Sequence, residues 1–131
     1  MADKDLGRAR ALLKSAETLY KEGDLAGVAG LAYQAFESAV IEFNKIVKGK
    51  DSASHKSRME TAKDIYAEHI HDLDFLWEMR NIDFYGNKKA GEVEDAGLEK
   101  EKIAKVLTTV RDIIIKTEEL LEKKKAGQTK L

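Results

Sequence analysis

The spacing of apolar residues predicts a chain made of helices. Apolar side chains recur every three or four positions along most of the sequence, and strict alternation of apolar and polar residues, the mark of a half-buried strand, is almost absent. Proline, the strongest helix breaker, does not occur in the sequence. The fold class is therefore predicted to be all-α.

Two long helices joined by a tight turn are expected first. The first apolar stripe stops at Gly23, and Asp24 then offers a carboxylate to the free amides that open a second helix. The second stripe ends near Gly49, a typical residue beyond a helix C-terminus. The expected inward-facing residues are Leu6, Leu12, Leu13, Ala16, Leu19 and Tyr20, then Leu25, Val28, Ala32, Phe36, Ala39, Val40, Phe43 and Val47.

A third helix is expected next, capped by Asp51, Ser52 or Ser54 and interrupted near Asp72. Its inward-facing residues should be Met59, Ala62, Tyr66, Ile70 and Leu73. The segment 72–85 differs because it is apolar on two sides, with Leu73, Leu76, Trp77 and Phe84 on one and Phe75, Met79 and Ile82 on the other. A helix with two apolar faces needs two covers, which predicts a homodimer.

The rest of the chain predicts a loop and a last long helix. Residues 86–97 contain three glycines and many charges without a stripe, which indicates a mobile loop. The last helix should bury Ile103, Val106, Leu107, Val110, Ile113, Ile114, Leu120 and Leu121. Short connections favour antiparallel neighbours, so we expect an up-down four-helix bundle with its third helix split in two. The bundle should form one domain over residues 1–131, ordered over about 4–122, with a fraying tail at 123–131.

Composition narrows the function classes. The 131 residues include no cysteine, which excludes disulfides and thiol chemistry, and the start of the chain lacks the apolar core of a signal peptide. No apolar run is long enough to span a membrane, so we expect a cytoplasmic protein without a membrane partner. A net charge of −1 means that any contact with nucleic acid must be local.

Arg80 is the residue that best indicates a site. Helical geometry places it among Leu76, Trp77 and Phe84, where a guanidinium needs a carboxylate, a phosphate or a route to water. A structural ion pair and an arginine that holds phosphate both fit this position. Glu37, beside the apolar stripe of the second helix, is the expected partner, and Glu17 is the second choice.

The block Arg80-Asn81-Ile82-Asp83-Phe84-Tyr85, close to a helix end, resembles the motif region of the HEPN superfamily. Tyr33-Gln34-Ala35-Phe36-Glu37 is similar to the second-helix pattern of that family, and the resemblance covers roughly Leu6 to Leu121. It implies a compact helical domain that binds nucleotide or RNA, or that partners a separately encoded minimal nucleotidyltransferase in a toxin–antitoxin type of module.

The sequence departs from the HEPN pattern at its histidine. The family places a histidine five to seven positions after the arginine, where this chain has Tyr85, Gly86 and Asn87. A phenol with a pKa of about 10 stays protonated near neutrality and is a poor base. We therefore expect ligand binding through Arg80, Asn81, Tyr85 and Glu37 without efficient catalysis.

Two alternatives stay open. The chain could be a metal-independent ribonuclease that uses Arg80 and Tyr85 with an acid such as Glu37. It could also be a helical interaction scaffold, since Ala11–Ala39 resembles a tetratricopeptide helical pair, although a single copy does not make a solenoid.

The histidines and a basic stretch complete the candidates. His69 and His71 are two positions apart, which points them in opposite directions on a helix, so no metal or other cofactor is expected. His55 fits a polar or packing role in the first turn of the third helix. The connection between the second and third helices is locally basic and could contact phosphates, although a solvated lysine-rich end also fits: Lys45, Lys48, Lys50, Lys56, Arg58 and Lys63.

Overall fold

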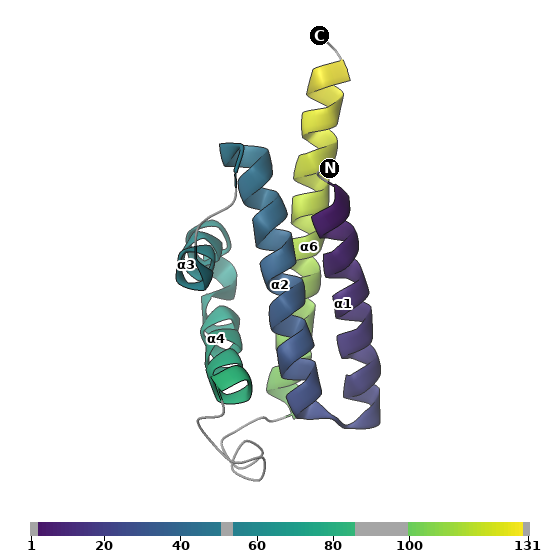
Figure 1. Cartoon of the computed structure of the whole chain (residues 1–131), viewed down its shortest axis with the longest axis vertical. Helices are drawn as coiled ribbons and strands as arrows, with labels where there is room; N and C mark the ends of the chain where they lie inside the picture. The colour runs from purple at the N-terminus through teal and green to yellow at the C-terminus, as the bar shows by residue number, and fades with distance from the viewer. Residues whose placement is uncertain (1–2, 51–53, 86–99, 130–131) are drawn as a thin grey trace.

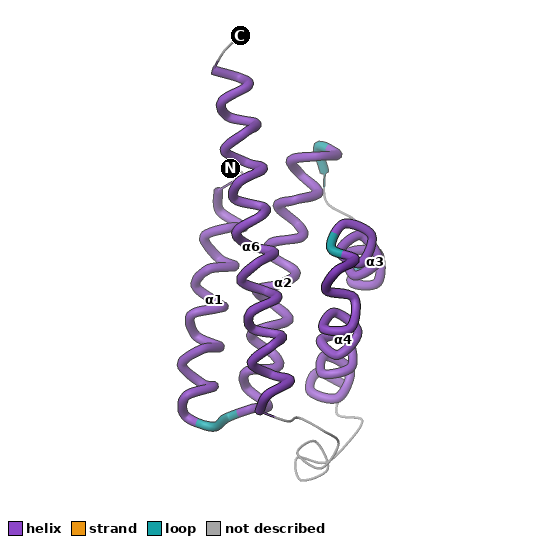
Figure 2. Tube along the Cα trace, turned by 180° about the vertical axis from the view of Figure 1, so that it is seen from behind, coloured by secondary structure: helices purple, strands orange, loops and turns teal. Residues whose placement is uncertain are grey.

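The structure is a computed structural model that describes residues 3–50, 54–85 and 100–129, without the side chains of residues 3, 79–85, 128 and 129. Every element within these ranges is helical, as predicted (Figure 2). The expected loop at 86–97 and the candidate caps Asp51 and Ser52 lie outside the described residues. No helix in the described ranges is both long and apolar enough to cross a membrane.

The first two helices form the expected hairpin. Helix α1 spans Asp3–Glu22 and helix α2 spans Leu25–Lys48. Gly23 turns the chain with a φ of 84°, in the left-handed region that favours glycine, and the Asp24 carboxylate accepts a hydrogen bond from the Gly27 amide at 3.0 Å. At the other end of α2, Gly49 has a φ of 80° and its amide donates to the Lys45 carbonyl.

The third helix is split, but not where the sequence predicted. Helix α3 spans His55–Ile65, and the Ser54 side chain caps it by accepting a hydrogen bond from the Ser57 amide. A 3-10 turn, η1, spans Ala67–His69, and helix α4 spans Ile70–Tyr85. The predicted break near Asp72 is wrong, because Tyr66 is the residue that leaves helical geometry. Tyr66 has a buried ring edge-on to Phe43, so a tertiary contact sets the break where no glycine or proline signals it.

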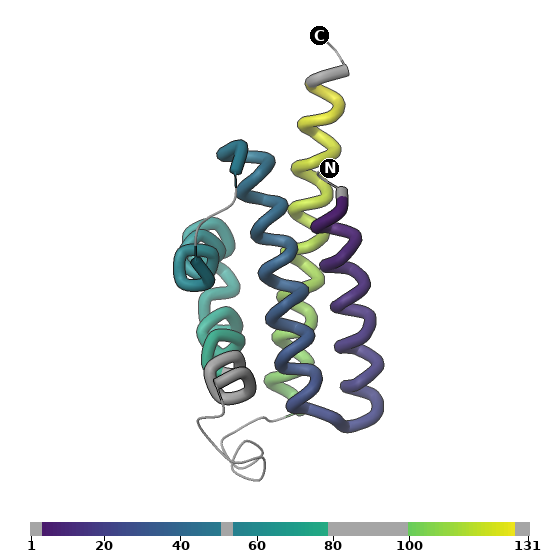
Figure 3. Tube along the Cα trace, in the orientation of Figure 1, coloured from purple at the N-terminus to yellow at the C-terminus, as the bar shows by residue number. Residues whose placement is uncertain are grey.

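The last helix, α6, spans Lys100–Thr129 and is helical past residue 122, where the ordered bundle was expected to end. Helices α1, α2 and α6 lie side by side, and α3 and α4 lie on the side of α2 that faces away from α1 (Figures 1 and 3). The C-terminal end of α6 extends beyond the start of α1 (Figure 1).

Buried apolar residues from α1, α2, α3, α4 and α6 form one core. The largest include Phe36, Tyr33, Leu73, Leu76 and Ile113, each less than 2% exposed. The predicted stripes supply most of this core, with two clear errors. Val47 is 55% exposed in the last turn of α2, and Ile70 is 40% exposed because the break at Tyr66 turns it outward. Glu42 and Asn44 of α2 are instead fully buried, which the apolar pattern does not predict.

Candidate functional site

The predicted site residues lie on two neighbouring helices. Arg80, Asn81 and Tyr85 belong to the C-terminal half of α4, and Glu37 is in the middle of α2. The side chains of the three α4 residues lie outside the described part of the structure, and with them the predicted pairing of Arg80 with Glu37. The second-choice partner, Glu17, forms an ion pair with Arg111 of α6.

Glu37 holds α3 against α2. Its Oε2 accepts a hydrogen bond from the Tyr33 hydroxyl at 3.2 Å and one from Arg58 Nη1 at 3.3 Å, and it also contacts His55 Nδ1. The Glu37 side chain is only 12% exposed, and that of Arg58 only 17%. A shielded carboxylate held by three groups is suited to positioning Arg58 and His55 rather than to transferring protons.

Sequence reasoning selected Glu37 but missed both of its α3 partners. Arg58 was assigned only to a basic stretch, and His55 only to a polar or packing role. Both reach Glu37 because α3 folds back beside α2 after the connection at 49–54, a path that no helical spacing predicts. The sequence does contain one signal for these contacts. A carboxylate lies on the edge of the apolar stripe of the second helix, and cationic residues lie at the start of the next helix.

A hollow of about 160 Å³ lies between α3 and α4, one to two turns before the predicted site on α4. It is lined by Lys56, Met59, Glu60, Lys63 and Trp77. Trp77 is partly buried, its ring centroid lies 6.3 Å from that of Tyr33, and it precedes Arg80 by three positions in α4. Lys63 also forms an ion pair with Asp74. The sequence singled out these lysines and this tryptophan separately, and the structure brings them together.

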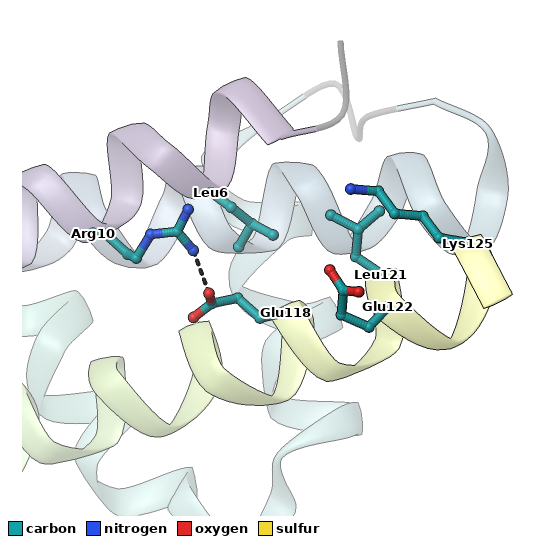
Figure 4. A pocket seen from close by; sticks show the side chains of 6 residues that line it. All are labelled: Leu6, Arg10, Glu118, Leu121, Glu122 and Lys125. Carbon is teal, nitrogen blue, oxygen red and sulfur yellow. Dashed lines mark hydrogen bonds and ion pairs between the residues drawn. The ribbon is translucent and has the colours of Figure 1, made fainter.

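A second hollow of about 160 Å³ lies between the start of α1 and the end of α6 (Figure 4). Arg10 and Glu118 form an ion pair across it, and Leu6 and Leu121 supply its apolar part (Figure 4). Lys125 and Glu122 complete the lining. The lining of this hollow includes no aromatic side chain on which a base could stack.

No family model, no curated protein and no solved structure matches this chain. The resemblance to the HEPN superfamily therefore stays an expectation based on the residues around Arg80 and Glu37. The function has to be argued from the chemistry of the site itself.

Proposed function

We propose that this chain is a HEPN-like domain that binds nucleotide or RNA through the adjoining surfaces of α3 and α4, without efficient catalysis. The observation that carries this proposal is the hollow in which Trp77 lies beside Lys56 and Lys63. An aromatic ring with nearby ammonium groups matches the two parts of a nucleotide, since the base can stack and the phosphate can be neutralised.

Arg80 extends this surface along α4. It follows Trp77 by about one helical turn, so its backbone lies within reach of a ligand stacked on that ring. A guanidinium can form two parallel hydrogen bonds with a phosphate, which a lysine cannot. Asn81 and Tyr85, on the following positions of α4, complete the proposed binding residues.

Glu37 has a supporting role in this proposal. It is not among the residues that line the hollow, and its contacts with Arg58 and His55 fix the start of α3, the helix that carries Lys56 and Lys63. A carboxylate that touched the ligand directly would repel phosphate. Glu37 is therefore proposed to position the binding surface rather than to contact the ligand.

The proposed assembly is a homodimer of four-helix bundles in which α3 and α4 together stand as the third helix. Its support is the second apolar side of α4, where Phe75 remains partly exposed within the single chain. A separately encoded minimal nucleotidyltransferase is the proposed protein partner, as in a toxin–antitoxin type of module. Light scattering of the purified chain tests the assembly, because a monomeric mass contradicts the homodimer.

The proposal is tested by titrating a labelled single-stranded RNA with the protein at several salt concentrations and following fluorescence anisotropy. For single strands, log affinity falls with log salt by about 0.7 per neutralised phosphate, so Lys56→Ala/Lys63→Ala should reduce the slope by about 1.4. The matched control is Lys14→Ala/Lys21→Ala, which removes the same charge from the exposed face of α1. An equal loss in both double variants would contradict a local site.

Further variants separate the base contact from the phosphate contact. Trp77→Leu should weaken RNA binding by about 1–3 kcal/mol with little change in the salt slope, since stacking releases no counterions. Arg80→Ala should lower both affinity and slope. RNA cleavage by metal-free protein that disappears in Arg80→Ala would favour the ribonuclease alternative, whereas absent or salt-insensitive binding would favour the scaffold.

A further inference from the structure

A cluster of potential metal ligands lies where the break in the third helix meets α6. Glu68 and His69 come from η1, and Asp112 comes from the middle of α6. His69 Nε2 lies 2.7 Å from Asp112 Oδ2 and 3.9 Å from Glu68 Oε1. One ligand atom from each of the three residues lies within 4.8 Å of the others.

A chain of contacts behind His69 orients its ring. His69 Nδ1 lies 3.5 Å from the Thr109 hydroxyl, which in turn donates to Asp72 at 2.8 Å. Thr109 is only 3% exposed, so this part of the network is shielded from solvent. Histidines that bind metals characteristically have the second ring nitrogen hydrogen-bonded to a polar group that fixes the ring and its tautomer. His69 has this arrangement, with Nε2 directed toward the two carboxylates.

Lys116 currently supplies the positive charge in this cluster. Its Nζ lies 2.6 Å from Glu68 Oε1 and 3.3 Å from Asp112 Oδ2. Its side chain is 42% exposed and also borders an open hollow of about 250 Å³ beside Tyr66, so it has room to turn away.

We propose that Glu68, His69 and Asp112 bind a divalent transition-metal ion, with zinc as the best fit, in place of the Lys116 ammonium. One imidazole nitrogen and two carboxylate oxygens are ligands that zinc accepts, and a water molecule would complete a tetrahedron. Bonds of about 2.1 Å at tetrahedral angles separate ligand atoms by about 3.4 Å. The separations of 2.7 and 3.9 Å from His69 bracket this value, and the two carboxylate oxygens lie within 4.8 Å of each other.

This site is independent of the proposed RNA surface, and it differs from the histidine pair considered in the sequence. The sequence compared His69 only with His71, whereas the partner of His69 in this cluster is Asp112 of α6, forty-three positions further along the chain. Metal bound there would join η1 to α6 and so secure the break between α3 and α4. Since metal binds only the folded arrangement, it would also raise the stability of the whole domain.

The test is to titrate the untagged, chelator-treated protein with zinc by calorimetry, and with cobalt while recording the visible absorption of tetrahedral Co²⁺. We expect one ion per chain. His69→Gln should weaken zinc binding by more than about tenfold, as loss of a ligand costs at least as much as loss of its supporting hydrogen bond. His71→Gln is the matched control, with an exposed histidine two positions away, and should leave the affinity unchanged.

Lys116→Gln should change the zinc affinity in the opposite direction from His69→Gln. Removing the competing ammonium should tighten zinc binding several-fold, whereas a purely structural ion-pair cluster would gain nothing. Circular dichroism confirms that each variant is folded, and Asp112→Asn replaces His69→Gln if that variant is not. No binding by the wild type, binding by Lys116→Gln alone, or binding that survives both ligand substitutions would overturn the proposal.

Discussion

Replacing Glu37 with glutamine tests whether this residue anchors α3. Glutamine has nearly the same shape as glutamate, so the substitution removes the negative charge without creating a cavity. The amide oxygen can still accept a hydrogen bond from the Tyr33 hydroxyl. The charge-assisted bond from Arg58 and the contact with His55 lose their electrostatic part.

The expected cost follows from the exposure of each partner. A hydrogen bond to a charged group contributes about 1.5–3 kcal/mol, against about 0.5–1.5 kcal/mol for a neutral one, so each shielded bond should weaken by about 1 kcal/mol. Tyr33 is 1% exposed and the Arg58 side chain 17% exposed, so solvent screens neither hydrogen bond strongly and the full weakening applies to each. The His55 side chain is 51% exposed and solvent screens most of its contribution. Glu37→Gln should therefore destabilise the fold by about 2 kcal/mol.

Urea unfolding followed by the fluorescence of Trp77, the single tryptophan of the chain, measures this loss directly. Trp77 packs near Tyr33, so its emission reports on the region around Glu37. Glu22→Gln is the matched control, because Glu22 is exposed at the end of α1 and its substitution should change the free energy of unfolding by less than about 0.5 kcal/mol.

A double-mutant cycle with Arg58→Met isolates the contribution of the ion pair. If Glu37 and Arg58 hold α3 together, the two substitutions should be non-additive by about 1 kcal/mol, because the second removes a bond that the first has already weakened. Strict additivity, or a loss in Glu37→Gln no larger than in Glu22→Gln, would refute the reasoning.

Three further predictions concern the helix ends, the core and alkaline pH. Gly49→Ala should lower the free energy of unfolding by about 1 kcal/mol, because alanine is strained at the φ of 80° that Gly49 adopts, although no atom would clash with its Cβ. Gly7→Ala, inside α1, should raise the free energy of unfolding by about 0.5–1 kcal/mol. Urea unfolding should therefore give opposite signs for the two variants. Leu73→Ala should lower the free energy of unfolding by about 2–5 kcal/mol, because Leu73 is fully buried. Ile115→Ala, at an exposed position, should lower it by less than about 1 kcal/mol in the same assay. Burial raises the pKa of Tyr66 above its ordinary value of 10.0, so the phenol stays neutral in the folded state when it ionises in the unfolded one. Its contribution to stability should be complete below pH 10 and decline as pH rises through the raised pKa, and Tyr66→Phe should show a smaller decline in urea midpoint.

Local signals in the sequence were sufficient for the first two helices. Gly23, Asp24 and Gly49 act through their own backbone geometry or through a hydrogen bond three residues away, which sequence spacing can predict. The break in the third helix could not be predicted in this way, because Tyr66 leaves helical geometry where its ring meets Phe43 of α2. Contacts between residues far apart in the chain leave no periodic mark.

The candidate site shows the same division. A carboxylate on the edge of an apolar stripe was enough to select Glu37, but its partners His55 and Arg58 depend on the path of α3. His69 was compared only with its neighbour His71, and its actual partner Asp112 lies on another helix. Spacing identifies residues that share an element, whereas a site assembled from several elements needs the fold.

The anchoring of α3 connects these observations. Its buried residues are only Met59 and Ala62, so few apolar contacts hold it, and the Glu37 cluster supplies much of the rest. A weakly buried helix should open locally at a smaller free-energy cost than the core helices. We infer that a ligand in contact with both α3 and Trp77 of α4 would tie these helices together and protect the α3 amides from hydrogen exchange. In this interpretation part of the binding surface lies on a weakly secured helix, so part of the ligand's binding energy is used to order it.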